Sequence, residues 1–278
     1  MSVSTPSAYP SPYPILQLFM NFGRILVLSQ NVFREVVRDR ILYIIGFYGL
    51  IVVASVRLLP EFAASTEDKM LPDFALAFMS GLGVIVAIFI GTGLVNKEIE
   101  KRTILMLIAK PISRSEFIIG KFIGLSAVLT VLLLAMTVVM LVCLQIAKVS
   151  YSIQAVTIAL IFLLLQLCLI AAVAITLGVF TSSLLATALT FGIYMMGTIT
   201  QDILKLSNIS GNPSLQRITQ VIYLILPDLS RLDFKNEAVY GLQALPNSVT
   251  LIANASYSIF YCVMLLSLAI LLISKREF

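Results

Sequence analysis

Residues 149–201 read VSYSIQAVTIALIFLLLQLCLIAAVAITLGVFTSSLLATALTFGIYMMGTITQ, a run of 53 residues without a charged side chain. About 20 apolar residues cross the hydrocarbon core of a bilayer, so this run is too long for one transmembrane helix and suits two. The polar triplet Thr181-Ser182-Ser183 divides it. The sequence therefore predicts two consecutive spans, Ile153–Phe180 and Leu184–Leu206, joined by a short polar turn.

The rest of the chain also has the composition of an integral membrane protein. Of its 278 residues, 59% are hydrophobic and 12% are charged, against about 25% charged residues in a soluble domain. Long apolar runs predict four further spans, whereas a membrane barrel would show alternating apolar and polar residues. We therefore predict an all-α polytopic membrane protein with six transmembrane helices. The four further spans are Ile41–Leu59, Phe74–Val95, Phe117–Ala147 and Val249–Ile273.

Catalytic and metal-binding chemistry finds little support in the sequence. The chain has no histidine, which removes the commonest metal ligand and general base together. Its three cysteines, Cys143, Cys168 and Cys262, lie within apolar runs, where they are typical of small buried hydrophobes. The phosphate-binding motif G-x-x-x-x-G-K-[ST] does not occur. We therefore predict a chain that is not an enzyme and that binds no metal or cofactor itself.

Charged residues are also missing from the interior of every predicted span. Ion-coupled transporters usually keep ionisable groups near the middle of the membrane, so energy for any transport must come from elsewhere. The strongest polar groups in or near the spans are Gln145, Gln154 and Gln166, for which we predict hydrogen bonds between helices, the alternative being a ligand site. The pairs Gly81-x-Gly83 and Gly91-x-Gly93 predict close helix packing.

The net charge of +5 is best interpreted by side of the membrane, and we predict no nucleic-acid partner. Cytoplasmic loops carry an excess of lysine and arginine. With both termini inside, twelve of the nineteen basic residues lie on the cytoplasmic side. We therefore predict cytoplasmic termini and a cytoplasmic location for residues 96–121.

Two segments precede the first span. The Ser/Pro-rich residues 1–14 predict a disordered tail. Residues 15–40 carry apolar side chains near helical spacing on one face and arginines on another, which predicts an amphipathic helix lying in the membrane interface. The alternative, an extension of the first span, would have to accommodate four arginines. The six-helix transmembrane domain is then predicted to cover residues 41–278.

The most informative polar segment lies between the second and third spans and reads NKEIEKRTILMLIAKPISRSEFIIGK over residues 96–121. Positive-inside topology and lipid contact would explain its basic residues alone. They do not explain the short apolar patch 104–108 or the break at Pro111. Ser113 and Glu116 form an S-x-x-E capping box, with Ile112 and Phe117 at the positions of a hydrophobic staple. We predict a short cytoplasmic helix that docks into a groove of a soluble partner.

The segment between the last two spans, residues 207–248, is predicted to be structured. Asn212-Pro213 suits a helix start and Pro227 suits its end, which predicts a re-entrant helix dipping into the outer leaflet. A second short helix is predicted from Asn236 to Tyr240, closed by Gly241. A partly buried surface loop is an equally good interpretation of this segment.

Several of these residues resemble a known family, the ABC-2-type transporter permeases. The resemblance rests on Glu98–Thr103, Leu107, Lys110–Arg114, Phe117 and Gly120-Lys121. The branch that the chain is most similar to is the one associated with multi-copper enzyme maturation. Leu226–Phe234 and Lys275–Phe278 are similar to that branch as well.

This resemblance implies a permease subunit of the bacterial inner membrane, driven by a separate ATPase that binds the ATP and Mg. Two permease subunits, identical or paralogous, would pair with two ATPase copies and contact membrane lipid. The coupling segment would cover residues 96–115, and Thr181, Ser182 and Ser183 would make a smaller second contact. The ATPase-coupling residues would be Glu98, Lys101, Arg102, Thr103, Leu107, Pro111 and Arg114.

Three functions are compatible with the sequence. The first is export of an amphiphilic or lipid-like substrate. The second is mechanotransmission, in which ATPase strokes act on a periplasmic partner and nothing crosses the membrane. The third is a passive membrane scaffold, which the organised segment 96–115 disfavours.

Overall fold

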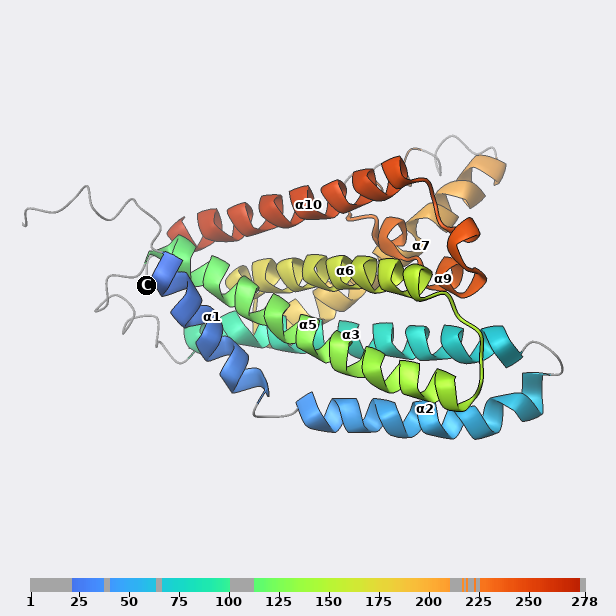
Figure 1. Cartoon of the computed structure of the whole chain (residues 1–278). Helices are drawn as coiled ribbons and strands as arrows, with labels where there is room; N and C mark the ends of the chain where they lie inside the picture. Colours follow the sequence, from blue (N-terminus) through green and yellow to red (C-terminus); the bar gives the residue numbers. More distant parts are fainter. Residues whose placement is uncertain are drawn as a thin grey trace, which may run out of the picture.

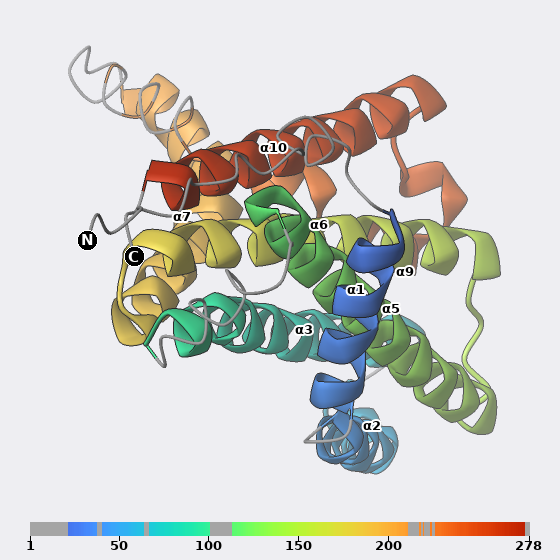
Figure 2. The ribbon, with the colours of Figure 1, turned by 90° about the vertical axis from the view of Figure 1, so that its left-hand side faces the viewer.

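The computed structural model describes residues 22–37, 41–63, 67–100, 113–210, 217, 219, 223 and 226–275. Within these ranges the chain is helical, and six helices are long and apolar enough to cross a membrane. The predicted all-α polytopic fold with six spans is confirmed. The long helices pack against one another at different angles, as the two views in Figures 1 and 2 show. They are α2 (Leu42–Ala63), α3 (Glu67–Glu100), α5 (Arg114–Ile146), α6 (Ile153–Phe180), α7 (Ser183–Ser210) and α10 (Ser248–Lys275).

Shorter elements lie at the two ends of the bundle. Helix α1 (Phe22–Val36) packs across the start of α5, at the end of the bundle where α3 and the last long helix finish. We call this the basic end. The opposite end carries η3 (Leu229–Leu232), α9 (Lys235–Tyr240) and η4 (Leu242–Ala244), which lie between α7 and α10 in the chain.

Some helix bounds differ from those predicted from hydropathy. Helix α3 begins at Glu67 and continues to Glu100, beyond both ends of the predicted span Phe74–Val95. Its apolar middle decides where the membrane lies, but the helix continues through charged residues because they are good helix formers. Pro72 lies inside the helix, in its second turn, where it removes one backbone hydrogen bond.

Helix α6 forms the centre of the bundle. Two thirds of its spanning window is buried (67%), against 17% for α2 at the edge. It packs on α3, α5, α7, α10 and the short helix α9. The sequence of α6 is apolar all round, as expected for a membrane-spanning helix that packs on other helices over most of its surface.

Small residues bring α3 against α6. A Cβ atom at Gly91 would lie 2.8 Å from the Cβ of Ala174, and one at Gly83 would lie 2.7 Å from the side chain of Leu167. The helices therefore touch where a side chain would not fit, as the predicted close packing requires. Gly81 differs, because a Cβ there would meet nothing within 4 Å.

This packing predicts opposite outcomes for two equivalent substitutions. Gly91→Ala should lower the free energy of unfolding by about 1–2 kcal/mol, because the Ala174 Cβ is fixed to its backbone and one helix must shift. Gly81→Ala should leave stability unchanged or slightly raised, since it adds helix propensity without a clash. Thermal unfolding of the two purified variants in the same detergent compares them. Equal shifts would show that the α3–α6 contact is not limited by space at Gly91.

Candidate coupling site at the start of α5

The basic end is organised around the first turns of α5. Ser113 is the N-cap, with φ −74° and ψ 150°. The backbone N–H of Glu116 donates to Ser113 Oγ (3.2 Å), and the backbone N–H of Ser113 donates to Glu116 Oε2 (2.9 Å). These reciprocal bonds satisfy two donors at the helix start and fix where α5 begins. The staple partner Ile112 lies outside the described residues.

Glu116 also connects α5 to α1. Its side chain is 2% exposed, and the guanidinium of Arg24 on α1 lies 3.9 Å from Glu116 Oε2. Two glycines of α5 allow the close approach. A Cβ at Gly120 or Gly124 would lie 2.8 Å from the Cβ of Leu28 or of Val32, respectively. Part of the apolar stripe of α1 is therefore buried on the protein itself.

Lys121 connects α5 to α3. Its side chain is buried, and its Nζ donates to the backbone carbonyl of Leu94 (3.0 Å) while lying 5.2 Å from the ring centroid of Phe117. An ammonium at this depth is held only where a partner compensates for its lost hydration. The bond joins the two helices that flank residues 101–112, so α3 and α5 are held together close to that segment.

Arg114 connects α5 to the end of α10. Its Nη1 donates to the carbonyls of Ile273 (2.9 Å) and Ser274 (2.6 Å). The last carbonyls of a helix have no partner within the helix, and a basic side chain satisfies them and complements the helix dipole. The sequence predicts Arg114 as a residue facing an ATPase. The structure gives its guanidinium a contact inside the chain.

The predicted second contact, Thr181 to Ser183, lies at the same end. Thr181 caps α6 by donating its hydroxyl to the Leu177 carbonyl (2.8 Å), and Ser183 begins α7. One turn into α7, the hydroxyls of Thr187 and Thr92 are 3.0 Å apart. The α6–α7 turn is thereby connected to the last part of α3.

The other sequence-predicted residues are placed only in part. Glu98 lies in α3, and its side chain is outside what the structure describes. Lys101, Arg102, Thr103, Leu107 and Pro111 fall within residues 101–112, which are also outside it. Sequence reasoning missed Arg24 and the role of Lys121. A signal for both existed, because Glu116 and Lys121 are charges in the first turns of a span.

At the opposite end, a second polar cluster joins the segment 226–247 to α7 and α10. We call residues 226–247 the η3–α9 segment. The carboxylate of Asp228, a residue 2% exposed, accepts hydrogen bonds from Gln201 Nε2 (3.1 Å), Ser230 Oγ (2.5 Å) and Arg231 Nε (2.9 Å). The Asp228 backbone N–H donates to the hydroxyl of Tyr257 on α10 (2.9 Å). Asp228 therefore attaches the segment to both α7 and α10.

Arg231 completes this cluster. Its guanidinium also bonds the Tyr223 hydroxyl and lies 5.3 Å from the ring centroid of Tyr257. Burial opposes the charged form, but the hydrogen bonds to Asp228 and Tyr223 outweigh it and raise the pKa of Arg231 above its ordinary value. The Arg231 carbonyl accepts from Asn254 Nδ2 (3.0 Å), a second bond to α10.

Further along the segment, α9 is the short helix predicted before Gly241, which has φ +93° and needs glycine. Lys235 donates to Ser80 Oγ on α3 (3.1 Å) and pairs with Asp233 (3.2 Å). Phe234 packs edge-on against Phe162 of α6, with ring centroids 4.8 Å apart. The η3–α9 segment thus contacts four of the six long helices. Most of the predicted helix between Pro213 and Pro227 lies outside the described residues.

The whole bundle matches a known family. The family model described as "ABC-2 family transporter protein" matches residues 26–277. A comparison with curated proteins gives no match. Families of this kind associate with an ABC ATPase subunit. Because the match covers nearly the entire chain, this multi-pass membrane protein belongs to the ABC-2 transporter family and is a membrane permease of an ABC transporter.

Proposed function

We propose that the chain is the permease of an exporter that moves an amphiphilic or lipid-like substrate outward, driven by a separate ATPase that binds ATP and Mg. Two such permeases, identical or paralogous, pair with two ATPase copies. The basic end faces the cytoplasm, with both termini there, and residues 96–115 contact the ATPase. The principal observation behind this proposal is the attachment of α1, α3 and α10 to the first turns of α5.

These contacts connect residues 96–115 mechanically to the long helices α3, α5 and α10. A displacement of residues 96–115 acts on the capped start of α5 and on the end of α3, which Lys121 holds together. Arg114 passes the displacement to α10. The far end of α10 is bonded to the η3–α9 segment through Asn254 and Tyr257. Motion at the basic end can therefore reach the opposite end through rigid helices.

The membrane itself also takes part in this arrangement. Phe22, Leu26 and Val27 on α1 are more than half exposed, beside the arginines of the same helix. This pattern suits a helix in the membrane interface, with its aromatic and aliphatic side chains among lipid tails. Because α1 also packs closely on α5, it would hold the start of α5 at a fixed depth in the membrane.

The test is capture of the ATPase by the tagged permease. Extraction from the native host in mild detergent, followed by mass spectrometry, should find a stoichiometric protein with a phosphate-binding loop. Leu107→Asp and Arg102→Glu should reduce its recovery at least about tenfold, since a charge of the wrong kind in a docked interface costs several kcal/mol. Recovery of a cytosolic ATPase through residue 107 would also place the basic end in the cytoplasm.

Two controls separate folding from docking. Arg34→Glu, on the exposed side of α1, should leave recovery unchanged, and both docking variants should elute as monodisperse as the unmodified permease. Full recovery with Leu107→Asp would show that residues 96–115 are not the docking site. Absence of any ATPase, even after crosslinking through a cysteine at position 107, would favour the scaffold.

Mechanotransmission is the second candidate function. It is supported by the many hydrogen bonds that attach the η3–α9 segment to the long helices, through which motion of the helices would move the segment. Vesicles containing the permease and its ATPase distinguish the two. Export requires ATP-dependent accumulation of a lipid-like compound across the membrane. Mechanotransmission requires ATP hydrolysis that depends on a periplasmic partner and gives no accumulation.

A further inference from the structure

Gln166, in the middle of α6, is buried without a hydrogen-bond partner. The residue is 1% exposed, and neither its amide nitrogen nor its amide oxygen is bonded to any group in the described part of the chain. The sequence predicted a hydrogen bond between helices at this position, and the structure forms none. Because an unpaired buried amide costs stability, such a group in a native fold calls for an explanation.

Helix geometry places Gln166 on the face of α6 that meets α7 and the η3–α9 segment. With 3.6 residues per turn, it shares a face with Phe162, Leu169, Ile170 and Val173. Phe162 contacts Phe234 of the η3–α9 segment. Leu169, Ile170 and Val173 line a pocket with side chains of α7 and that segment. Gln166 is thus the polar position between two places where the segment covers α6.

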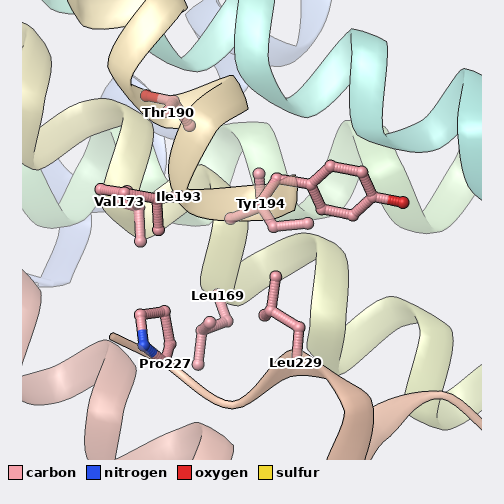
Figure 3. A pocket seen from close by; sticks show the side chains of 8 residues that line it. Leu169, Val173, Thr190, Ile193, Tyr194, Pro227 and Leu229 are labelled. Atoms are coloured by element: carbon pink, nitrogen blue, oxygen red, sulfur yellow. The ribbon is translucent and has the colours of Figure 1, made fainter. Parts of the chain in front are cut away.

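A narrow seam between α6, α7 and the η3–α9 segment lies on this face of α6, and Gln166 itself is not one of its lining residues. The seam is too narrow to hold a water molecule and is lined by Leu169, Ile170, Val173, Thr190, Ile193, Tyr194, Pro227 and Leu229. Figure 3 shows the side chains of α6 and α7 facing Pro227 and Leu229 across it. Sites for small molecules usually exceed about 300 Å³. In this conformation the seam is therefore closed, and its walls are mainly apolar.

The cover of this seam is held mainly at its margins. Hydrogen bonds of Asp228 and Arg231 attach it to Gln201 on α7 and to Asn254 and Tyr257 on α10. Close packing adds to them at Gly197, where a Cβ would lie 2.6 Å from the Pro227 carbonyl oxygen. Movement of α7 or α10 relative to α6 would therefore shift Pro227 and Leu229 and widen the seam.

We propose that this seam is a binding site for the substrate and that Gln166 recognises its head group. When the η3–α9 segment moves away from α6, the amide becomes available to a group that both donates and accepts hydrogen bonds, such as a hydroxyl or an amide. An apolar chain of the same molecule lies against Leu169, Ile170 and Val173. This proposal rests on the proposed export function for the motion that opens the seam.

The experiment uses Thr190→Cys as a reporter inside the seam, in a chain whose three native cysteines are replaced by alanine. Thr190 is 1% exposed and lies on the seam wall. The permease and its ATPase are reconstituted in phosphatidylethanolamine–phosphatidylglycerol vesicles, and reaction with N-ethylmaleimide is followed with and without ATP. Monododecanoylglycerol, which carries two hydroxyls, is the probe amphiphile, and dodecane is its control without a head group.

We expect ATP to accelerate the labelling and monododecanoylglycerol, but not dodecane, to slow it again. Gln166→Met should lower the apparent affinity for the probe by about three- to tenfold, the worth of one or two hydrogen bonds. Its unfolding temperature should be no lower than that of the unmodified chain. Gln154→Met, at an exposed glutamine on the first turn of the same helix, should keep full protection.

Equal protection in the Gln166→Met and Gln154→Met chains would overturn the assignment of Gln166, and protection by dodecane would overturn the head-group preference. If adding ATP does not change the rate of Thr190→Cys labelling, it is the proposed coupling between the ATPase and the seam that is wrong. The same comparison is then made in Asp228→Ala, which loosens the cover without an ATPase. Protection that depends on Gln166 in that variant supports the site, and its absence there overturns it.

Discussion

Asp228→Ala is expected to lower the free energy of unfolding of the permease by about 3 kcal/mol, the low end of the cost of breaking a buried ion pair, because Asp228 is buried but Arg231 is 38% exposed. The carboxylate is 2% exposed and accepts hydrogen bonds from three side chains. Its loss leaves Arg231 without its counter-ion and Gln201 without its acceptor. The unfolding temperature should fall by about 5–10 °C, by the usual relation for a chain of this size.

Asp202→Ala is the matched control for this substitution. Asp202 also pairs with a basic residue three positions away, Lys205, but its side chain is 70% exposed. An exposed pair contributes about 0–1 kcal/mol, because water screens both charges and the side chains lose freedom. Thermal unfolding of both variants in one detergent gives the comparison. A shift for Asp228→Ala no larger than that for Asp202→Ala would show that the η3–α9 segment is held by packing alone.

A local readout accompanies the global one. If Asp228 attaches the segment to α7 and α10, its removal should speed hydrogen exchange of the η3 and α9 amides more than that of α6. The amides of α6 are expected to be better protected, because its spanning window is the most buried of the six. Equal acceleration in α6 and α9 would instead mean that the whole bundle had loosened.

Those features of the fold that depend on one helix and the bilayer could be predicted from the sequence. The spans follow from hydropathy, because a helix in lipid must satisfy its own backbone. The N-cap at Ser113 and the glycine at 241 also follow, since each depends on residues adjacent in the chain. The packing role of Gly91 could be inferred as well, although not its partner Ala174.

Contacts between distant parts of the chain could not be predicted in this way. Lys121 counted as a topology signal in the sequence, whereas the structure bonds it to the Leu94 carbonyl. Which carbonyl it meets depends on how α3 and α5 cross. Gln166 shows the opposite error, because a buried amide predicts a partner and none is present among the described residues. The role proposed for Gln166 depends on how the helices move relative to one another, and the periodicity of apolar residues does not report such motion.

Arg114→Ala is expected to uncouple ATP hydrolysis from motion at the opposite end while leaving the ATPase bound. The guanidinium satisfies two carbonyls at the end of α10, and its removal cuts the connection between α5 and α10. In vesicles, we expect the ATP-dependent labelling of Thr190→Cys to fall at least about tenfold. The cost in stability should be only about 1–2 kcal/mol, the cost of a lost helix cap.

Arg114→Lys and Arg34→Ala are the control variants for this substitution. Lysine keeps the charge near the helix end and can donate to carbonyls, but its side chain is shorter than that of arginine, so it should restore part of the coupling. Arg34 lies on the exposed side of α1, and its removal should change nothing. The sequence alone had placed Arg114 against the ATPase, and that role predicts a different result, in which Arg114→Ala releases the ATPase.

Co-purification of the ATPase with Arg114→Ala therefore decides between the two roles. Retained ATPase with lost labelling would place the defect in α10, between the docking segment and the η3–α9 segment. Lost ATPase would return Arg114 to the docking surface beside Leu107. Retained ATPase with full labelling would mean that α3 and α6 carry the motion, through the contact at Gly91 and Ala174, and that α10 follows them passively.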